Sequence, residues 1–168
     1  MKILLRLSFS ILFGLALLEI LLRFFWLLPV TAKGAYLCRD AVADHSHYPY
    51  GVGRMKSQEF SVVLRMNNIG MRDDDVETVK PAGVRRVLLL GDSFMEGWGV
   101  ERGAIFTDRL EVEMEKRYPE ERIEVVAVGV ASWSPLCELA WLKHNGFALS
   151  PDAVVLAVDA TDLAADSF

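Results

Sequence analysis

The sequence predicts an α/β protein: a three-layer α/β/α, flavodoxin-like arrangement with a parallel sheet, incomplete at the C-terminus and preceded by an N-terminal transmembrane helix. Two observations lead to this expectation. Short apolar runs alternate with longer amphipathic segments between residues 87 and 158. Residues 1–30 are apolar over a length that suits a bilayer.

Composition divides the chain into three segments. Residues 1–30 are expected to form a signal anchor, residues 31–83 a linker and lead-in segment, and residues 84–168 a partial α/β domain. The net charge of −5 argues against a nucleic-acid partner. The three histidines show no metal-ligand spacing, so we expect neither a metal nor a cofactor.

The N-terminal tract has two interpretations. Lys2 and Arg6 precede an uncharged run from Leu7 to Leu18, as in a retained anchor whose N-terminus stays inside. Alternatively, a signal peptide is cleaved after Ala32. The tract is long for a cleaved signal, which favours the single-pass anchor. Both interpretations place the remainder outside the cytoplasm, in the periplasm or at the cell surface, with the membrane as a partner.

The segment 31–83 lacks strong periodicity. Residues 60–66 have the composition of a strand, and residues 67–70 give a turn signal. We therefore expect a linker that gains some β structure near the domain. Cys38 and Cys137 are far apart in the sequence and either form a disulfide or remain isolated thiols.

The order of elements in the third segment is strand, helix, strand, helix, strand. Residues 87–90 form a short apolar run ending in Gly91, which suits a buried parallel strand. Residues 105–118 have an amphipathic helical pattern that ends before Pro119. The remaining strands are expected over residues 123–128 and 153–158, and the second helix over residues 135–142.

This βαβαβ order brings three polar loops to one edge of the sheet. Connections between parallel strands place the carboxyl ends of all strands on the same side, where ligands bind. The loops at that edge are residues 91–93, 129–132 and 159–162. Ser93, two residues beyond the first strand, can either cap a helix or present a hydroxyl for nucleophilic chemistry.

The stretch from residue 87 to residue 100, VLLLGDSFMEGWGV, resembles the first block of the SGNH/GDSL hydrolases, in their membrane-anchored bacterial branch. The resemblance extends from Tyr48 to the C-terminus and implies a partial SGNH-type domain. It implies that Ser93 is the nucleophile and that its backbone N–H helps to hold an oxyanion. By alignment, the backbone of Ser132 and the side chain of Thr161 take the places of the other two donors.

The departures from this pattern concern the donors. Ala127 stands where the family has an asparagine, and Ser132 stands where it has a glycine. A loop that needs a positive φ would resist serine. Thr161 replaces an asparagine with a hydroxyl on a shorter stem, and loss of one such donor costs about 10²–10³ in turnover.

The base of the family is a histidine in an Asp-x-x-His block, and no such block occurs before Phe168. His144, at a predicted helix end, has the ordinary interpretation of a solvated or capping residue. Two expectations follow: a truncated form of a longer enzyme, or an inactive protein. Asp92 is expected to support the Ser93 loop, and Asp162 to cap a helix or pack against the first block.

The function that the resemblance implies is hydrolysis of esters or O-acetyl groups outside the cytoplasm, on a small ester or an acylated glycan. The alternative is an inactive SGNH-like domain that binds a glycan or another partner. A nucleotide-binding flavodoxin-like domain is disfavoured, because neither a GxGxxG nor a GxxxxGK[ST] motif is present.

Overall fold

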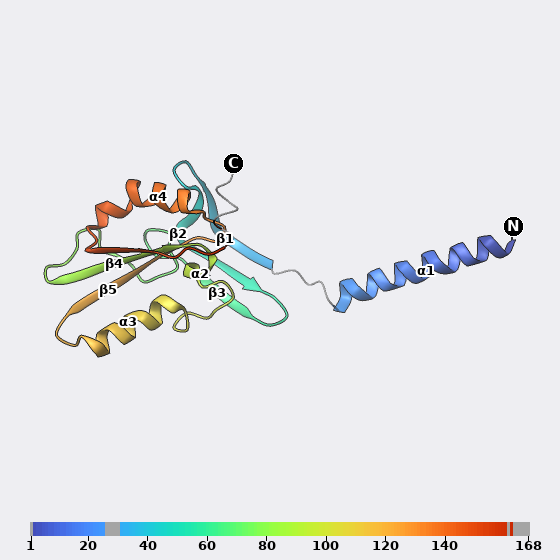
Figure 1. The fold of residues 1–168 in the computed structure, drawn as a ribbon, viewed down its shortest axis with the longest axis horizontal. Coiled ribbons are helices and arrows are strands. Elements are labelled where there is room, and N and C mark those ends of the chain that lie inside the picture. The colour runs from blue at the N-terminus through green and yellow to red at the C-terminus, as the bar shows by residue number, and fades with distance from the viewer. Residues whose placement is uncertain (1, 26–30, 161, 163–168) are drawn as a thin grey trace.

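The computed structural model describes residues 2–25, 31–160 and 162 of the chain (Figure 1). It is a mixed α/β protein with two sheets. In chain order the elements are α1 (Lys2–Phe25), β1 (Thr31–Asp40), β2 (Asp44–Lys56), β3 (Ser61–Arg65), β4 (Val84–Gly91), α2 (Ser93–Glu96), α3 (Phe106–Arg117), β5 (Arg122–Gly129), α4 (Pro135–His144), a 3₁₀ turn (Gly146–Leu149) and β6 (Ala153–Leu156).

The N-terminal helix α1 is drawn apart from the two sheets in Figure 1. Its side chains from Arg6 to Leu21 are exposed. Within the described ranges, no helix meets the length and apolarity that a membrane crossing requires.

The segment expected to be a linker forms an antiparallel sheet in the order β1-β2-β3. Val62 and Leu64 alternate inward from β3 and pack with Tyr36, Met55 and Met66 in a small core. The sequence pattern hid β1 and β2 because polar residues and glycines interrupt them. At Gly34, with φ +126°, an added β-carbon would overlap the carbonyl of Val52, so the close approach of the strands needs glycine.

The second sheet is parallel, in the order β5-β4-β6, which confirms the prediction of a parallel βαβαβ unit. Its register places Leu88 beside Val126 on one side and Val154 on the other. Helices α3 and α4 lie on opposite sides of this sheet (Figure 1). Alternate residues of the strands therefore enter two different cores.

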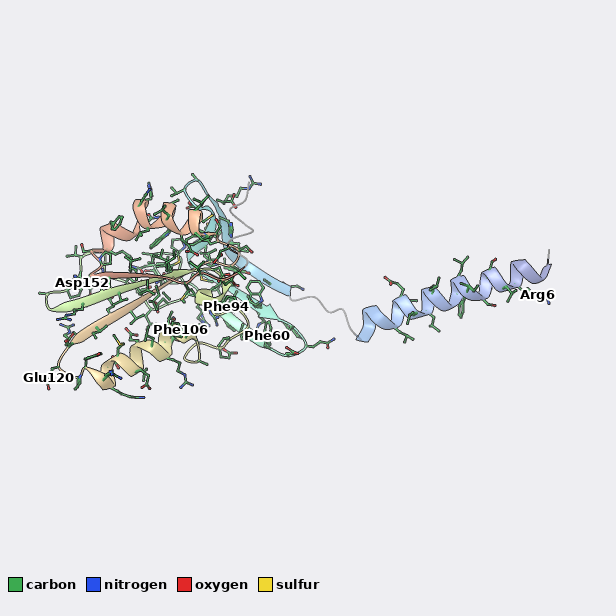
Figure 2. The ribbon with its side chains drawn as sticks, in the orientation of Figure 1. Arg6, Phe60, Phe94, Phe106, Glu120 and Asp152 are labelled. Carbon is green, nitrogen blue, oxygen red and sulfur yellow. The ribbon has the colours of Figure 1, made fainter. Side chains whose placement is uncertain are left out.

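The side chains of β4 and β5 fill both faces of the parallel sheet (Figure 2). On the α4 face, Leu88 and Leu90 pack with Trp133 and Trp141. On the α3 face, Leu89 packs with Met95 and Val125. Strand β6 is exposed along its length.

The two sheets are joined by specific polar contacts. Trp133 Nε1, beyond β5, donates to the backbone carbonyl of His45 in β2 over 2.7 Å.

Cys38 and Cys137 are both free thiols. The domain boundaries drawn from composition stay a prediction. The segment expected to be a linker contains the strands β1, β2 and β3.

Candidate functional site

The loops after β4 and β5 meet at the carboxyl edge of the parallel sheet, as the βαβαβ order predicts. The backbone N–H of Val130 donates to the carbonyl of Gly91 over 3.4 Å. Glu96, after β4, is hydrogen bonded to Ala131, after β5. These contacts bring Ser93 and Ser132 into neighbouring loops of one edge.

Ser93 is the first residue of α2 and is half-buried. Asp92 caps this short helix, because its Oδ1 accepts the backbone N–H of Phe94 over 2.9 Å. The carbonyl of Ser93 accepts the N–H of Trp98 over 2.9 Å. The Ser93 hydroxyl makes no hydrogen bond with any residue in the described part of the chain. The backbone of Ser93 is therefore held in place, and its hydroxyl is available to a ligand.

Arg72 fixes the far end of α2. Arg72 is 3% exposed. Its guanidinium donates to the carbonyls of Glu96, Gly97 and Val100 at 3.2, 2.6 and 2.7 Å. Three donors in a planar fork suit three carbonyls of one turn. The buried arginine therefore shapes the chain that follows Ser93.

Ser132 is exposed and adopts a positive φ of 68°. This is the left-handed conformation that favours glycine and that an L-residue adopts at a cost. A serine therefore occupies a backbone conformation that favours glycine.

We predict that Ser132→Gly raises the free energy of unfolding by about 0.5 kcal/mol. Relief of the left-handed strain contributes about 1 kcal/mol, and the greater freedom of glycine in the unfolded chain offsets part of it. Ser134→Gly is the matched control, because Ser134 has φ −104° and should gain nothing. Denaturant unfolding of both variants measures the difference, and equal or lower stability of Ser132→Gly would contradict the prediction.

Glu96 is the buried acid of the site, with 2% exposure. Its Oε2 accepts the backbone N–H of Ala131 over 2.7 Å. Its Oε1 lies 3.8 Å from Nε2 of His47, and neither atom has a hydrogen-bond partner among the described residues. Burial raises the pKa of Glu96 to about 7, although the Ala131 N–H, Arg72 and His45 each lower it.

The pKa values of the two histidines of β2 shift in opposite directions. His47 Nδ1 lies 3.1 Å from the carbonyl of Gly70, which only accepts, so this nitrogen carries the proton. Burial lowers the pKa of His47 to about 4, which keeps the ring neutral. His45 contacts two acceptors, the Asp44 carboxylate at 2.9 Å and the Ala131 carbonyl at 2.8 Å. Burial lowers the pKa of His45, but these two contacts outweigh it and the net shift is upward.

A pocket of about 370 Å³ opens between β1, β2 and the Ala131–Ser132 loop. Trp98, which is 40% exposed, lies at this pocket and follows α2. The side chains that matter here are Tyr36, Leu37, His45, Glu96, Trp98 and Ser132. The antiparallel sheet therefore forms one wall of a space beside the predicted oxyanion loop.

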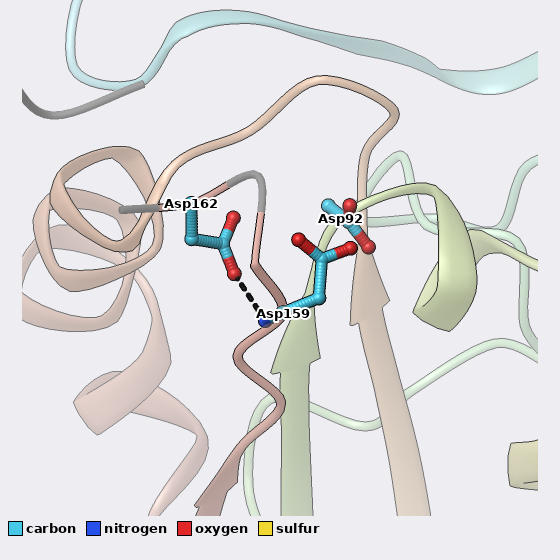
Figure 3. A group of neighbouring side chains, drawn as sticks. All are labelled: Asp92, Asp159 and Asp162. Carbon is cyan, nitrogen blue, oxygen red and sulfur yellow. Dashed lines mark hydrogen bonds between the residues drawn. The ribbon is translucent and has the colours of Figure 1, made fainter. Parts of the chain in front are cut away.

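Three carboxylates gather where the loops after β4 and β6 meet (Figure 3). Ligand atoms of Asp92, Asp159 and Asp162 lie within 4.8 Å of one another, and oxygen atoms of this kind suit a hard cation. Asp162 is buried and its Oδ2 accepts the backbone N–H of Asp159 over 2.7 Å, so it organises this loop beside Asp92 of the first block. Thr161, the third expected donor, lies outside the described residues.

Comparisons with known proteins can be set against this geometry. No family profile and no curated protein matches the chain. The chain is similar to one solved structure. This is the crystal structure of AlinE4, an SGNH-hydrolase family esterase, at 22% sequence identity and a TM-score of 0.40. The alignment covers 51% of this chain and 45% of that chain, so it spans less than half of the AlinE4 structure.

Sequence reasoning located Ser93, Asp92, Ser132 and Asp162 at this edge but missed the groups that hold the loops. Glu96 lies within the GDSFMEGWG stretch. Its charge, between a methionine and a glycine, was the one feature of the sequence that could have indicated a role for it. Arg72 and His45 gave none. His144 is exposed at the end of α4, as a solvated histidine would be.

Proposed function

We propose that the chain carries the nucleophile portion of an SGNH-type serine esterase. Ser93 attacks the carbonyl carbon of an ester and gives up its hydroxyl proton to water, the ester C–O bond breaks to release the alcohol, and water then hydrolyses the acyl-serine. The developing negative charge is held by the backbone N–H groups of Ser93 and Ser132. The observation that carries the proposal is the position of Ser93, at the carboxyl edge of a parallel sheet with an unengaged hydroxyl. Asp92 and Arg72 support it by fixing the two ends of α2.

Proton transfer limits the rate of such a reaction. An unassisted serine is a weak nucleophile, and no histidine in the described ranges is hydrogen bonded to Ser93. His45 and His47 instead bind carbonyls of neighbouring loops. We therefore expect slow turnover by this chain, and we expect it on activated esters, whose leaving groups need little protonation.

Hydrolysis of an aryl acetate tests the proposal. The chain should release the phenol faster than buffer alone, and Ser93→Ala should lower the protein-dependent rate about a hundredfold. Ser150→Ala is the control, because Ser150 is exposed and precedes β6 at the opposite edge of the sheet. Equal rates for the chain and Ser93→Ala would remove the esterase and leave the alternative, an inactive domain that binds a glycan or another partner.

We propose a small ester or an O-acylated glycan as the substrate. The pocket beside Ser132 has room for a group of a few heavy atoms, and the partly exposed Trp98 offers a face on which a sugar ring can stack. Comparison of phenyl acetate with an acetylated oligosaccharide, each with and without Trp98→Ala, tests the preference. A stacking contact predicts that the alanine variant loses rate on the oligosaccharide alone.

We also propose that α1 anchors the chain in a membrane, with the sheets outside the cytoplasm. The exposed apolar side chains of Leu7 to Leu18 and the positive charge of Arg6 support this. The chain should stay with membranes during an alkaline carbonate wash. Leu12→Asp should release part of it, since an acid placed among apolar side chains in the bilayer costs about 3 kcal/mol. Release of the unaltered chain by the wash would exclude anchoring.

A further inference from the structure

One side chain joins the two loops that face the proposed oxyanion. Glu96 ends α2, the helix that Ser93 begins. Its Oε2 accepts the N–H of Ala131 over 2.7 Å, and Ala131 directly precedes Ser132. The carboxylate therefore connects the element that carries the nucleophile with the residue that carries the second N–H.

The position of Glu96 itself is fixed from two sides. Gly129 at the end of β5 leaves no room for a side chain: an added β-carbon would overlap the backbone N of Glu96 and lie 2.6 Å from the backbone carbonyl carbon of Met95. On the other side, the carbonyl of Glu96 accepts from Arg72 over 3.2 Å. Since α2 is held in this way, the Glu96 side chain ties the Ala131 N–H to it, while His45 Nε2 lies 2.8 Å from the carbonyl of the same residue.

We propose that Glu96 is a positioning residue that sets the Ala131–Ser132 loop against Ser93. Resting on the proposed function, this means that Glu96 sets the distance between the two N–H groups that hold the oxyanion. It touches no reacting atom and acts through the Ala131 amide. The positive φ of Ser132 gives such a tie a role, because an L-residue adopts this conformation at a cost that its surroundings offset.

The charge on Glu96 governs the strength of the tie. A carboxylate is a stronger acceptor than a neutral acid, so ionisation tightens the bond to Ala131. Burial raises the pKa of Glu96 to about 7, and this change therefore falls in the neutral range. The titratable or charged groups around Glu96 come from β1, β2, the segment before β4 and the start of α2: Tyr36, His45, His47, Arg72 and Asp92.

The amide proton of Ala131 reports this tie directly. In ¹H–¹⁵N spectra of the full chain from about pH 5 to about pH 9, its resonance should move downfield as Glu96 ionises, with a midpoint near the Glu96 pKa. Glu96→Gln keeps an acceptor oxygen but cannot ionise, and the Ala131 titration should disappear. Persistence of this titration in Glu96→Gln, or its absence from the unaltered chain, would overturn the inference.

Strand β5 supplies a matched control. Asp73 Oδ2 accepts the N–H of Ala127 over 2.7 Å, and burial raises the pKa of Asp73 to about 6. Asp73→Asn should abolish the titration of the Ala127 amide and leave that of Ala131 unchanged. Loss of both titrations in Asp73→Asn would mean that Ala131 senses the whole fold and not Glu96.

Kinetics separate this inference from the proposed function. If Ser93 hydrolyses the aryl acetate, Glu96→Leu should lower kcat about a hundredfold with little change in KM, as loss of one oxyanion donor does. Glu96→Gln should keep most of kcat and lose the inflection of kcat near neutral pH. Ser93-dependent hydrolysis without an Ala131 response refutes the inference alone. An Ala131 response that follows Glu96, without any Ser93-dependent hydrolysis, refutes the function and leaves the joining of the two loops in place.

Discussion

Replacing Trp133 with alanine should lower the free energy of unfolding by about 4 kcal/mol. The side chain is 2% exposed, and its ring lies 6.4 Å from that of Trp141 between centroids, inside the core on the α4 face. Its Nε1 also donates a hydrogen bond to the backbone carbonyl of His45 in the other sheet. The substitution therefore opens a cavity in one core and removes a contact between the two sheets.

Trp133→Phe separates these two contributions. Phenylalanine keeps most of the apolar volume but leaves the His45 carbonyl without its donor, a loss of about 1–3 kcal/mol. Denaturant unfolding followed by circular dichroism measures both variants without relying on tryptophan emission. A loss below about 1 kcal/mol for Trp133→Ala would show that the site collapses around the missing ring.

Replacing Arg72 with methionine should be similarly damaging, with a loss of about 4 kcal/mol. The carbonyls of Glu96 and Val100 lose their donor, whereas that of Gly97 keeps the backbone N–H of Val100 at 3.0 Å. Each buried acceptor left without a partner costs about 1–3 kcal/mol, part of which relaxation recovers. Arg72→Lys should recover only part of the loss, because one ammonium group cannot reproduce the planar fork.

Arg85→Met is the control for the removal of an arginine. The Arg85 side chain is 69% exposed and pairs with Glu121 over 3.1 Å, an arrangement that contributes about 0–1 kcal/mol. Denaturant midpoints of the three variants test the difference. Equal losses for Arg72→Met and Arg85→Met would contradict the view that Arg72 shapes the end of α2.

Strands β4 and β5 of the parallel sheet could be predicted from the sequence because they lie between two helical layers. Burial on both faces makes residues 87–90 and 125–128 continuous apolar runs, which are visible without any contact information. The antiparallel sheet could not be predicted in the same way. Its strands expose one face, and glycines at Gly34 and Gly53 stand where β1 and β2 approach most closely.

The candidate site was predictable where it depends on local sequence. Ser93 and Asp92 follow a strand directly, but Ser132 adopts the positive φ that a serine was expected to resist. The supports of the site depend on distant pairs: Glu96 and Ala131 are 35 positions apart, and His45 and Ala131 are 86 apart. No pattern of spacing in a single sequence reveals such contacts, because they join segments that only the folded chain brings together.

The missing β-carbon of Gly129 has a mechanical consequence. At Gly129 the main chain of α2 rests on the main chain of β5 with no side chain between them, so at this point no change of rotamer can absorb a displacement. A shift of the helix at this point therefore moves the strand, and a shift of the strand moves the helix. A substitution that changes the size of a side chain at this junction cannot adjust the spacing between the two elements. The spacing can change only when one backbone moves relative to the other.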